Sequence, residues 1–467
     1  MNGGTATIGV MTRLWLVSGA IITSTTACVA QSAPPVPAMQ PPAATSAQQA
    51  PVPSQTEPQP PAATAAQPAP TPEAPEQEGP KWTRDLAREL LMAINESFSA
   101  GLNPSDYQAD ALAKAIDRNK KAEIDPIART AFAALVRDLR DGRAPQSARL
   151  EWDIKDGDAA ARPTEAVMQE ALISGDIAGS LAALEPDHPD YMALKAALAA
   201  TPGNQAERIA RLRANLDRWR WLPRSLGTRY ILVNVPAYKL KLMDGGALKS
   251  EHRIIVGQQK TSTPQLSATV QGVIFNPSWY VPQSIMKEGL GSLIRSNPAG
   301  ARAKGYDWTV SGGTIYARQL PGPTNALGYV KLDMPNPHAI FIHDTPAKHL
   351  FDREVRTFSH GCIRTDKAMF LAGMLSGYYA GKTPQEIGDI VRSGKTTKIP
   401  VREPFPIYIG YFTAAPEADG TVAFHDDIYG RDIPLIALFG SAAAQKKAVP
   451  ATNGTQPVLN SEERLLN

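Results

Sequence analysis

Cysteine is nearly absent from this chain, and its scarcity narrows the chemistry that the sequence can support. Among the 467 residues, only Cys28 and Cys362 are cysteines. The CxxC and HxxxH pairs that are typical of structural zinc sites are also missing. Cys28 lies in an N-terminal segment that we expect to be removed or lipidated. The mature chain would then hold one thiol and no partner for a disulfide within it.

The chain also lacks an excess of charge of either sign. It has 48 Lys and Arg residues against 45 Asp and Glu residues, which gives a net charge of +3. This balance gives no reason to expect a nucleic-acid partner. The hydrophobic content of 43% is ample for a core, and the length allows two or three domains.

Residues 31–80 lack Lys, Arg, Leu, Ile and every aromatic residue, yet they hold 15 of the 41 prolines. Such a segment cannot bury enough apolar surface to offset the entropy lost on ordering. We interpret it as a disordered, extended and semi-rigid linker.

The first thirty residues resemble a signal peptide. Arg13 is their only charged residue, and the apolar run "LWLVSGAII" (14–22) follows it. This run is too short to remain as a membrane anchor. Cleavage after Ala30 predicts a soluble exported protein, whereas cleavage before Cys28 would produce a lipid-anchored one. We favour the soluble form, because the leucine that usually lies three residues before a lipidated cysteine is missing.

The remainder divides into a helical and a mainly β region. From 81 to 225, apolar residues recur at helical spacing, so we expect an α-helical domain. From 228 to 435 the residues become β-branched and aromatic, and "DGG" (244–246) lies where a hairpin turn is expected. Residues 440–467 are expected to form a flexible tail. Within the helical region, three apolar stripes each predict a helix. Their residues are Trp82, Leu86, Leu90, Ile94 and Phe98, then Phe132, Leu135, Val136 and Leu139, and finally Ile209, Leu212, Leu216 and Trp219.

Two sets of charged residues have a structural interpretation. The arginines near the end of the helical region predict a solvated or domain-contacting face rather than an anion site. Asp366 precedes an apolar helical run and is expected to cap that helix. The arginines are Arg208, Arg211, Arg213, Arg218 and Arg220.

Cys362 lies close to two histidines that could take its proton. An exported single thiol suggests a reactive residue, since a neighbouring histidine can generate the nucleophilic thiolate. His360 is two positions away, but Gly361 between them indicates a bend. His343 ends a predicted strand, and a base on an adjacent strand can face the thiol. We therefore favour His343 as the base, with His360 as the alternative.

The residues around Cys362 could complete an acyl-transfer site. The backbone N–H groups of Gly361 and Cys362 could bind an oxyanion. Arg364 could hold a substrate carboxylate, or it could form a structural ion pair instead. A zinc site made by His343, His360 and Cys362 is a competing hypothesis, although a fourth ligand is not evident.

The segment "IHDTPAKHLFDREVRTFSHGCIR" resembles the active-site signature of L,D-transpeptidases with a YkuD-type catalytic domain. Fifteen residues separate His343 from Ser359, within the spacing of that signature. The segments 208–240, 274–285, 321–336 and 424–432 resemble the large periplasmic YcbB-like branch. The helical region, with "AGLNPSDY" (100–107), resembles the scaffold domain of that branch.

This resemblance implies an α+β multidomain protein. An α-helical scaffold domain would precede a mainly β, β-sandwich-like catalytic domain, with a lid or capping subdomain at about 283–325. That lid is short, and only residues 199–207 occupy the place where this branch often carries a peptidoglycan-binding domain.

The resemblance also implies a reaction and its participants. Cys362 would attack a peptidoglycan tetrapeptide stem, release D-Ala and form a thioester, which the diaminopimelate amine of a second stem would convert into a 3→3 cross-link. His343 would act as base and then acid, the backbone carbonyl of Asp344 would orient it, and His360 and Gly361 would shape the oxyanion site. Such enzymes are acylated by carbapenems. Candidate substrate-binding residues are Ser359, Arg364, Trp279, Asn325 and Tyr306.

No cofactor or metal is implied. Tetrapeptide stems are the expected partners, other wall-synthesis enzymes are further candidates, and the expected compartment is the periplasm. Two alternatives remain open. The same acyl-enzyme could serve a hydrolase or a protein-anchoring enzyme, or the chain could be a catalytically inactive wall-binding scaffold.

Overall fold

The computed structural model describes residues 80–155 and 158–440, which all belong to one compact unit, residues 76–467. The predicted signal peptide, the linker up to residue 79 and the tail after residue 440 lie outside the described residues. Across the described ranges, no helix combines the length and the apolar character that crossing a bilayer requires.

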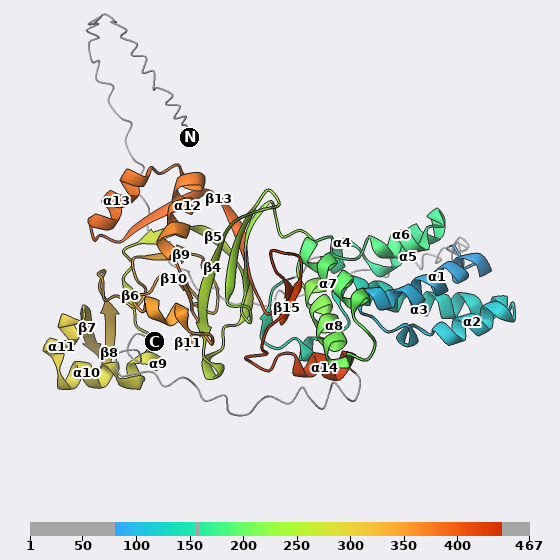
Figure 1. Ribbon diagram of the computed structural model, residues 1–467, viewed down its shortest axis with the longest axis horizontal. Coiled ribbons are helices and arrows are strands. Elements are labelled where there is room, and N and C mark those ends of the chain that lie inside the picture. The colour runs from blue at the N-terminus through green and yellow to red at the C-terminus, as the bar shows by residue number, and fades with distance from the viewer. Residues whose placement is uncertain (1–79, 156–157, 441–467) are drawn as a thin grey trace, which may run out of the picture. The chain divides into compact units, whose positions relative to one another are not determined.

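The first part of the described chain is helical, as the apolar spacing predicts (Figure 1). Thr83 caps the first helix by accepting a hydrogen bond from the Leu86 N–H at 3.2 Å. Leu90 and Ile94 are fully buried, but Phe98 lies beyond the helix end and is 48% exposed, so its predicted place on the apolar stripe was wrong. The helices are α1 (Arg84–Glu96), α2 (Ala109–Asp117), α3 (Lys121–Asp141), α4 (Asp158–Ala161), α5 (Thr164–Ser174), α6 (Ile177–Ala182), α7 (Pro189–Ala200) and α8 (Ala206–Arg220).

The following region is mainly β, as expected, and most of its strands form one sheet that closes on itself. The strand order is β1-β5-β13-β2-β3-β4-β12-β10-β9, and β9 also pairs with β5. This last pairing makes a closed ring rather than the two facing sheets of a sandwich. The strands are β1 (Trp152–Asp153), β2 (Arg229–Asn234), β3 (Lys239–Asp244), β4 (Ala247–Gly257), β5 (Gln265–Phe275), β9 (Val330–Asp333), β10 (Ile342–His343), β12 (Ile363–Thr365) and β13 (Thr397–Gly410).

Local sequence explains the hairpin in this sheet. Asp244 pairs with Ala247 across the predicted turn, and Gly245 and Gly246 both have positive φ, at 61° and 74°. Two successive positive φ angles characterise the type I′ turn, which glycine adopts without a Cβ penalty. β11 (Thr357–Ser359) pairs with β4 beside this sheet, and α12 (Ala368–Ala380) and α13 (Pro384–Arg392) complete the region.

Asp366 does not cap α12, contrary to the prediction. The residue before this helix is Lys367, in a left-handed conformation and without a side-chain cap. The Asp366 carboxylate instead forms an ion pair with Arg253, with an N–O distance of 2.8 Å. A charged partner on a neighbouring strand has therefore replaced the local capping bond.

A small subdomain with its own core follows β5. Its three-stranded sheet, in the order β6-β8-β7, packs on short helices. It begins at Trp279, slightly before the predicted start of the lid. Its elements are β6 (Trp279–Tyr280), α9 (Gln283–Ile285), a π-helical turn (Met286–Leu290), α10 (Gly291–Ser296), α11 (Pro298–Ala303), β7 (Tyr306–Ser311) and β8 (Thr314–Gln319). We call these residues, 279–319, the cap.

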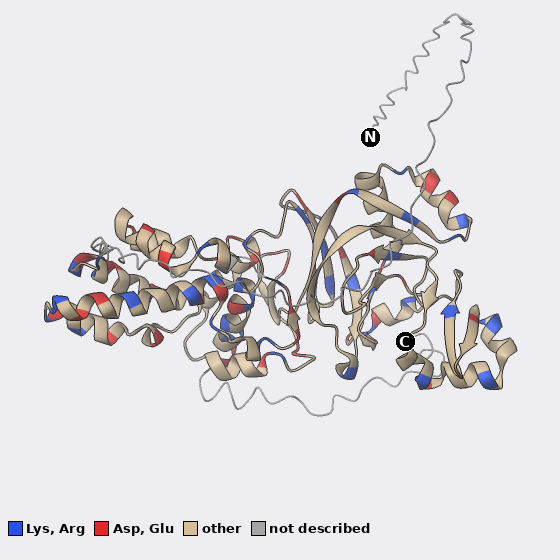
Figure 2. Ribbon diagram, turned by 180° about the vertical axis from the view of Figure 1, so that it is seen from behind, with Lys and Arg blue, Asp and Glu red and all other residues tan. Residues whose placement is uncertain are grey.

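The predicted arginine face of α8 contacts other parts of the chain. Figure 2 shows basic and acidic residues interspersed along the helices of the helical region. Arg218 is 1% exposed and forms an ion pair with Asp432 at 2.5 Å, and the Thr413 hydroxyl donates to the same carboxylate at 2.7 Å. Arg211 and Arg213 donate to backbone carbonyls of Thr413 and Phe439. The chain after β13, with β14 (Ala414–Pro416), β15 (Val422–Phe424) and α14 (Ile433–Phe439), is thereby held against α8.

The buried pair predicts a large effect on stability. Asp432→Ala would leave the Arg218 guanidinium buried without its carboxylate, which costs about 3–5 kcal/mol. The matched control is Asp389→Ala, because Asp389 is 61% exposed in its pair with Arg392. An exposed pair contributes about 0.2–1 kcal/mol. The free energies of unfolding in urea should differ accordingly. Equal losses in the two variants would contradict the assigned role of the buried pair.

Candidate active site

The strand register gathers four side chains on one face of the sheet. β10 runs parallel to β12, with Ile342 opposite Ile363 and His343 opposite Arg364. Both isoleucines belong to the hydrophobic core. Since side chains alternate along a strand, His343, Arg364 and Cys362 project from the opposite face. β9 adds Lys331, which pairs with His343 from the other side.

The hydrogen bonds of His343 fix its tautomer. Its Nδ1 lies 2.5 Å from the backbone carbonyl of Asp344, and a carbonyl can only accept. The proton therefore resides on Nδ1, and Nε2 is left as an acceptor. Burial, together with the positive charge of Arg364, lowers the pKa of His343 to about 3. The imidazole is thus neutral at ordinary pH.

Asp344, whose backbone carbonyl orients the imidazole of His343, is itself fixed through its carboxylate. It is 2% exposed, it accepts from the Tyr329 N–H at 3.0 Å, and it pairs with Lys348. A Cβ at Gly328 would lie 2.3 Å from this carboxylate, so only glycine fits there. The predicted contact from the Asp344 carbonyl to His343 is present, and these bonds immobilise it.

Cys362 is a free thiol in a partly buried position. The Phe341 N–H donates to its sulfur at 3.4 Å, and the sulfur lies 3.9 Å from the Ala339 carbonyl. Burial raises the pKa of Cys362, although the Phe341 N–H and the charges of Arg364 and Lys331 oppose this. Among the described hydrogen bonds, none joins Cys362 to His343. The resting pair is therefore a neutral thiol and a neutral imidazole.

The loop that carries Cys362 is held by its own hydrogen bonds. The Ser359 hydroxyl donates to the Cys362 carbonyl at 2.5 Å and accepts from the Gly361 N–H at 3.2 Å. Gly361 has a φ of 108°, which favours glycine. The Gly361 N–H that we expected to face an oxyanion is thus directed at Ser359. Ser359 is 2% exposed and shapes the loop instead of facing a substrate.

His360 connects the same loop to the cap. Its Nε2 donates to the Glu288 carboxylate at 2.8 Å, and its buried Nδ1 has no hydrogen-bond partner among the described residues. Among the described hydrogen bonds, none joins His360 to the Cys362 sulfur. Within the described part of the chain, no group of three or more His, Cys, Asp or Glu side chains is arranged to hold a metal ion.

The remaining predicted substrate-binding residues are buried. Trp279 and Tyr306 are 8% and 5% exposed, and their rings pack in the core of the cap with residues such as Met286 and Leu290. Asn325 is fully buried, and its amide donates to backbone carbonyls such as that of Pro277. Arg364 is 2% exposed beside His343, so a substrate carboxylate does not reach it in this conformation.

Lys331 is the residue that sequence reasoning missed. It lies next to His343 in the sheet, its ammonium lies 4.2 Å from the centre of the Phe341 ring, and its charge acts on both Cys362 and His343. Burial lowers the pKa of Lys331. The sequence could have indicated it, because Lys331 interrupts the apolar strand-like run "GYVKLDM". The alternation of side chains along a strand directs this lysine away from the core, to the face that carries His343.

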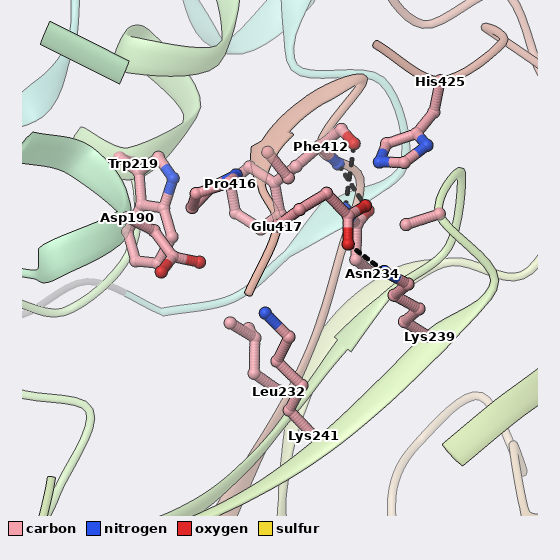
Figure 3. A pocket seen from close by; sticks show the side chains of 12 residues that line it. Asp190, Trp219, Leu232, Asn234, Lys239, Lys241, Phe412, Pro416, Glu417 and His425 are labelled. Atoms are coloured by element: carbon pink, nitrogen blue, oxygen red, sulfur yellow. Dashed lines mark hydrogen bonds and ion pairs between the residues drawn. The ribbon is translucent and has the colours of Figure 1, made fainter. Parts of the chain in front are cut away.

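Two cavities differ in their relation to this site. A cleft of about 660 Å³ is lined by His360 and Gly361. The four site residues line neither this cleft nor the pocket in Figure 3, but the cleft adjoins the Cys362 loop, whereas the pocket is lined by residues such as Trp219, Lys241 and His425. Its volume of about 20 Å³ suits a water molecule rather than a peptide. The cleft is therefore the candidate substrate-binding feature.

Comparison with known proteins identifies two domains by sequence. Residues 228–401 match the model of the L,D-transpeptidase catalytic domain, YkuD. Residues 74–198 match the model of the Scaffold domain. A Haemophilus influenzae protein named "Putative L,D-transpeptidase" is 33% identical over 218 residues, which cover 43% of this chain and 44% of that protein. The match thus spans less than half of this relative's length.

Solved structures of lower similarity include the L,D-transpeptidase from Mycobacterium smegmatis. It is 11% identical, with a TM-score of 0.21, and the match covers 39% of this chain and 58% of that one. Mycobacterium tuberculosis L,D-transpeptidase 1 is also 11% identical, with a TM-score of 0.18 and coverage of 39% and 61%. Scores this low do not establish a shared fold.

The position of Lys331 predicts a change in thiol reactivity. Lys331→Met removes a positive charge beside Cys362, so the pKa of the thiol rises and less thiolate is present at a given pH. We expect alkylation of Cys362 by iodoacetamide at pH 8 to slow about two- to fivefold. Lys331→Arg keeps the charge and should retain most of the rate.

Lys249→Met, on the exposed part of β4, is the matched control and should leave this rate unchanged. The full pH–rate profile of alkylation gives the direction of the shift. A profile for Lys331→Met that coincides with that of the control would show that Lys331 does not act on the thiol.

Proposed function

Because the chain carries a YkuD-type L,D-transpeptidase catalytic domain behind a Scaffold domain, we propose that it forms 3→3 cross-links in peptidoglycan through a thioester on Cys362. The observation that supports the proposal most is the parallel pairing of β10 with β12, because the free thiol of Cys362 directly precedes β12 and His343, with its fixed tautomer, lies on β10. The proposed donor is a tetrapeptide stem, and the proposed acceptor is the side-chain amine of a second stem.

In the first half-reaction, Cys362 Sγ attacks the carbonyl carbon of the third residue of the donor stem. His343 Nε2 takes the thiol proton and then gives it to the departing nitrogen of D-Ala. The C–N bond breaks, and a thioester remains. In the second half-reaction, the acceptor amine attacks the thioester and loses its proton to His343. The cross-link forms, and the sulfur recovers a proton.

The environment of the two groups suggests when the proton moves. Because burial and Arg364 keep His343 neutral, a preformed thiolate–imidazolium pair is disfavoured at rest. Proton transfer would accompany the attack, once the bound stem has replaced water around the sulfur. Lys331 and Arg364 would then stabilise the negative charge that develops on Sγ.

The N-terminal thirty residues support an exported, periplasmic location, where the cell-wall substrate lies. The same thiol would also be the point of acylation by carbapenems. Acyl transfer to water or to a protein would use the same first half-reaction, so the acceptor alone distinguishes these activities from cross-linking.

The proposal predicts products that mass spectrometry can identify. Purified protein incubated with disaccharide-tetrapeptides should give a tetrapeptide–tripeptide dimer and free D-Ala. Cys362→Ala should abolish both products, and His343→Ala should lower their rate about 10²–10⁴-fold. His349→Ala, an exposed histidine outside the site, is the matched control and should behave like the wild type.

Other product patterns would contradict the proposal in distinct ways. Tripeptide without dimer would indicate a hydrolase, and the absence of every product would indicate an inactive scaffold. Activity retained in Cys362→Ala would exclude this thiol as the nucleophile.

A further inference from the structure

The cleft beside the Cys362 loop has walls from two regions of the chain. Thr261, Ser262, His338 and Gly361 line it from the catalytic domain. The second wall comes from the segment 146–153, which follows the long helix α3 of the helical region. With a volume of about 660 Å³, the cleft falls in the range of peptide- and ligand-sized sites.

The second wall is built into the catalytic sheet. β1 pairs in parallel with β5, with Trp152 opposite Gln265 and Asp153 opposite Leu266. The Gln265 side-chain amide also donates to the Leu150 carbonyl at 2.8 Å. These bonds fix the segment in register with the strand that leads to the cap.

Side-chain bonds hold the same wall to the loops of the site. The Glu151 carboxylate accepts from the Ser262 hydroxyl at 2.7 Å and pairs with Arg431, which is 3% exposed. Gly361 approaches Ser262 closely, since an added Cβ would lie 3.6 Å from the Ser262 carbonyl. Ser262 thus contacts both the wall, through Glu151, and the Cys362 loop, through Gly361.

Asp153 supplies the negative charge that this wall presents to the cleft. Asp153 is 53% exposed and accepts from His338 Nε2 at 2.8 Å. Arg149, the basic residue of the wall, donates to the backbone carbonyls of Ala144 and Asp141 and stacks on Trp221 at 4.9 Å. Its guanidinium therefore donates within its own segment, and Glu151 is paired with Arg431, so Asp153 is the carboxylate of the wall that has no arginine or lysine partner among the described ion pairs.

The cap and this cleft both adjoin the loop that carries Cys362. His360 and Gly361 line the cleft together with Ser262, and His360 Nε2 also donates to Glu288 of the cap. A transfer reaction between two stems needs two binding surfaces that meet at one thioester. An anionic surface suits the stem that brings an amine, because its ammonium is attracted before it loses a proton.

We propose that the segment Arg149–Asp153 forms the acceptor-binding wall, and that Asp153 is a specificity-determining residue for the amine of the second stem. The inference rests on the proposed function and extends it, because it gives the helical region a direct part in selecting the acceptor. Asp153 acts on the second half-reaction only, by concentrating and orienting a cationic acceptor.

The two half-reactions can be separated with two probes. A tetrapeptide whose diaminopimelate side-chain amine is acetylated can only donate, and a tripeptide with a free amine can only accept. Using the full chain, D-Ala release reports acylation, and dimer formation at varied tripeptide concentration gives the acceptor KM. Asp153→Asn should raise this KM roughly fivefold, while the rate of D-Ala release from the donor alone changes little.

Two further readouts distinguish an electrostatic role from a structural one. In the wild type the acceptor KM should rise with NaCl concentration, and this dependence should weaken in Asp153→Asn. Asp153→Glu keeps the charge and should recover most of the acceptor affinity. Asp389→Asn, an exposed carboxylate on α13 outside the cleft, is the matched control and should match the wild type.

The outcomes separate this inference from the function on which it rests. If the wild type releases no D-Ala, the proposed function fails, and the acceptor assignment fails with it. If D-Ala release is normal but Asp153→Asn keeps the acceptor KM and the salt dependence of the wild type, only the acceptor assignment is overturned. An equal loss in Asp153→Asn and Asp153→Glu would also overturn it, since charge would then not matter.

Discussion

The parallel pairing of β10 with β12 is the constraint on which the rest of the site depends. It sets His343 opposite Arg364 and directs both, with Cys362, away from the core that Ile342 and Ile363 fill. A slip of one residue would exchange the two faces and bury the imidazole among the aliphatic side chains. The core residues therefore determine the register, and the register directs His343, Arg364 and Cys362 to the same face of the sheet.

The same burial determines the chemistry at rest. It lowers the pKa of His343 and raises that of Cys362, so both groups are neutral, while Lys331 and Arg364 supply a positive field that favours a thiolate once one forms. The histidine is held in one tautomer by the Asp344 carbonyl, and the thiol loop is held by Ser359. The site therefore stabilises a thiolate that forms during the reaction, whereas the thiol stays neutral at rest.

Patterns of local origin were predictable from the sequence. The apolar spacing predicted α1, α3 and α8, the glycines at 245 and 246 predicted the hairpin, and the strand-like run that ends at His343 suggested a base on a strand adjacent to Cys362. Features that depend on distant partners were not predictable. The burial of Arg218 requires Asp432, and β1 requires β5 as its partner. Trp279 and Tyr306 show the same limit, because an aromatic residue in a glycine-rich segment can line a cleft or fill a core.

The central claim is that Cys362 carries the donor stem as a thioester. It is tested most directly by the intact mass of the protein, quenched in acid after mixing with a tetrapeptide donor that lacks a free acceptor amine. The account predicts an added mass equal to the donor minus D-Ala, and peptide mapping should place it on Cys362. An adduct on another residue, or D-Ala release by a protein that never gains this mass, would contradict the account.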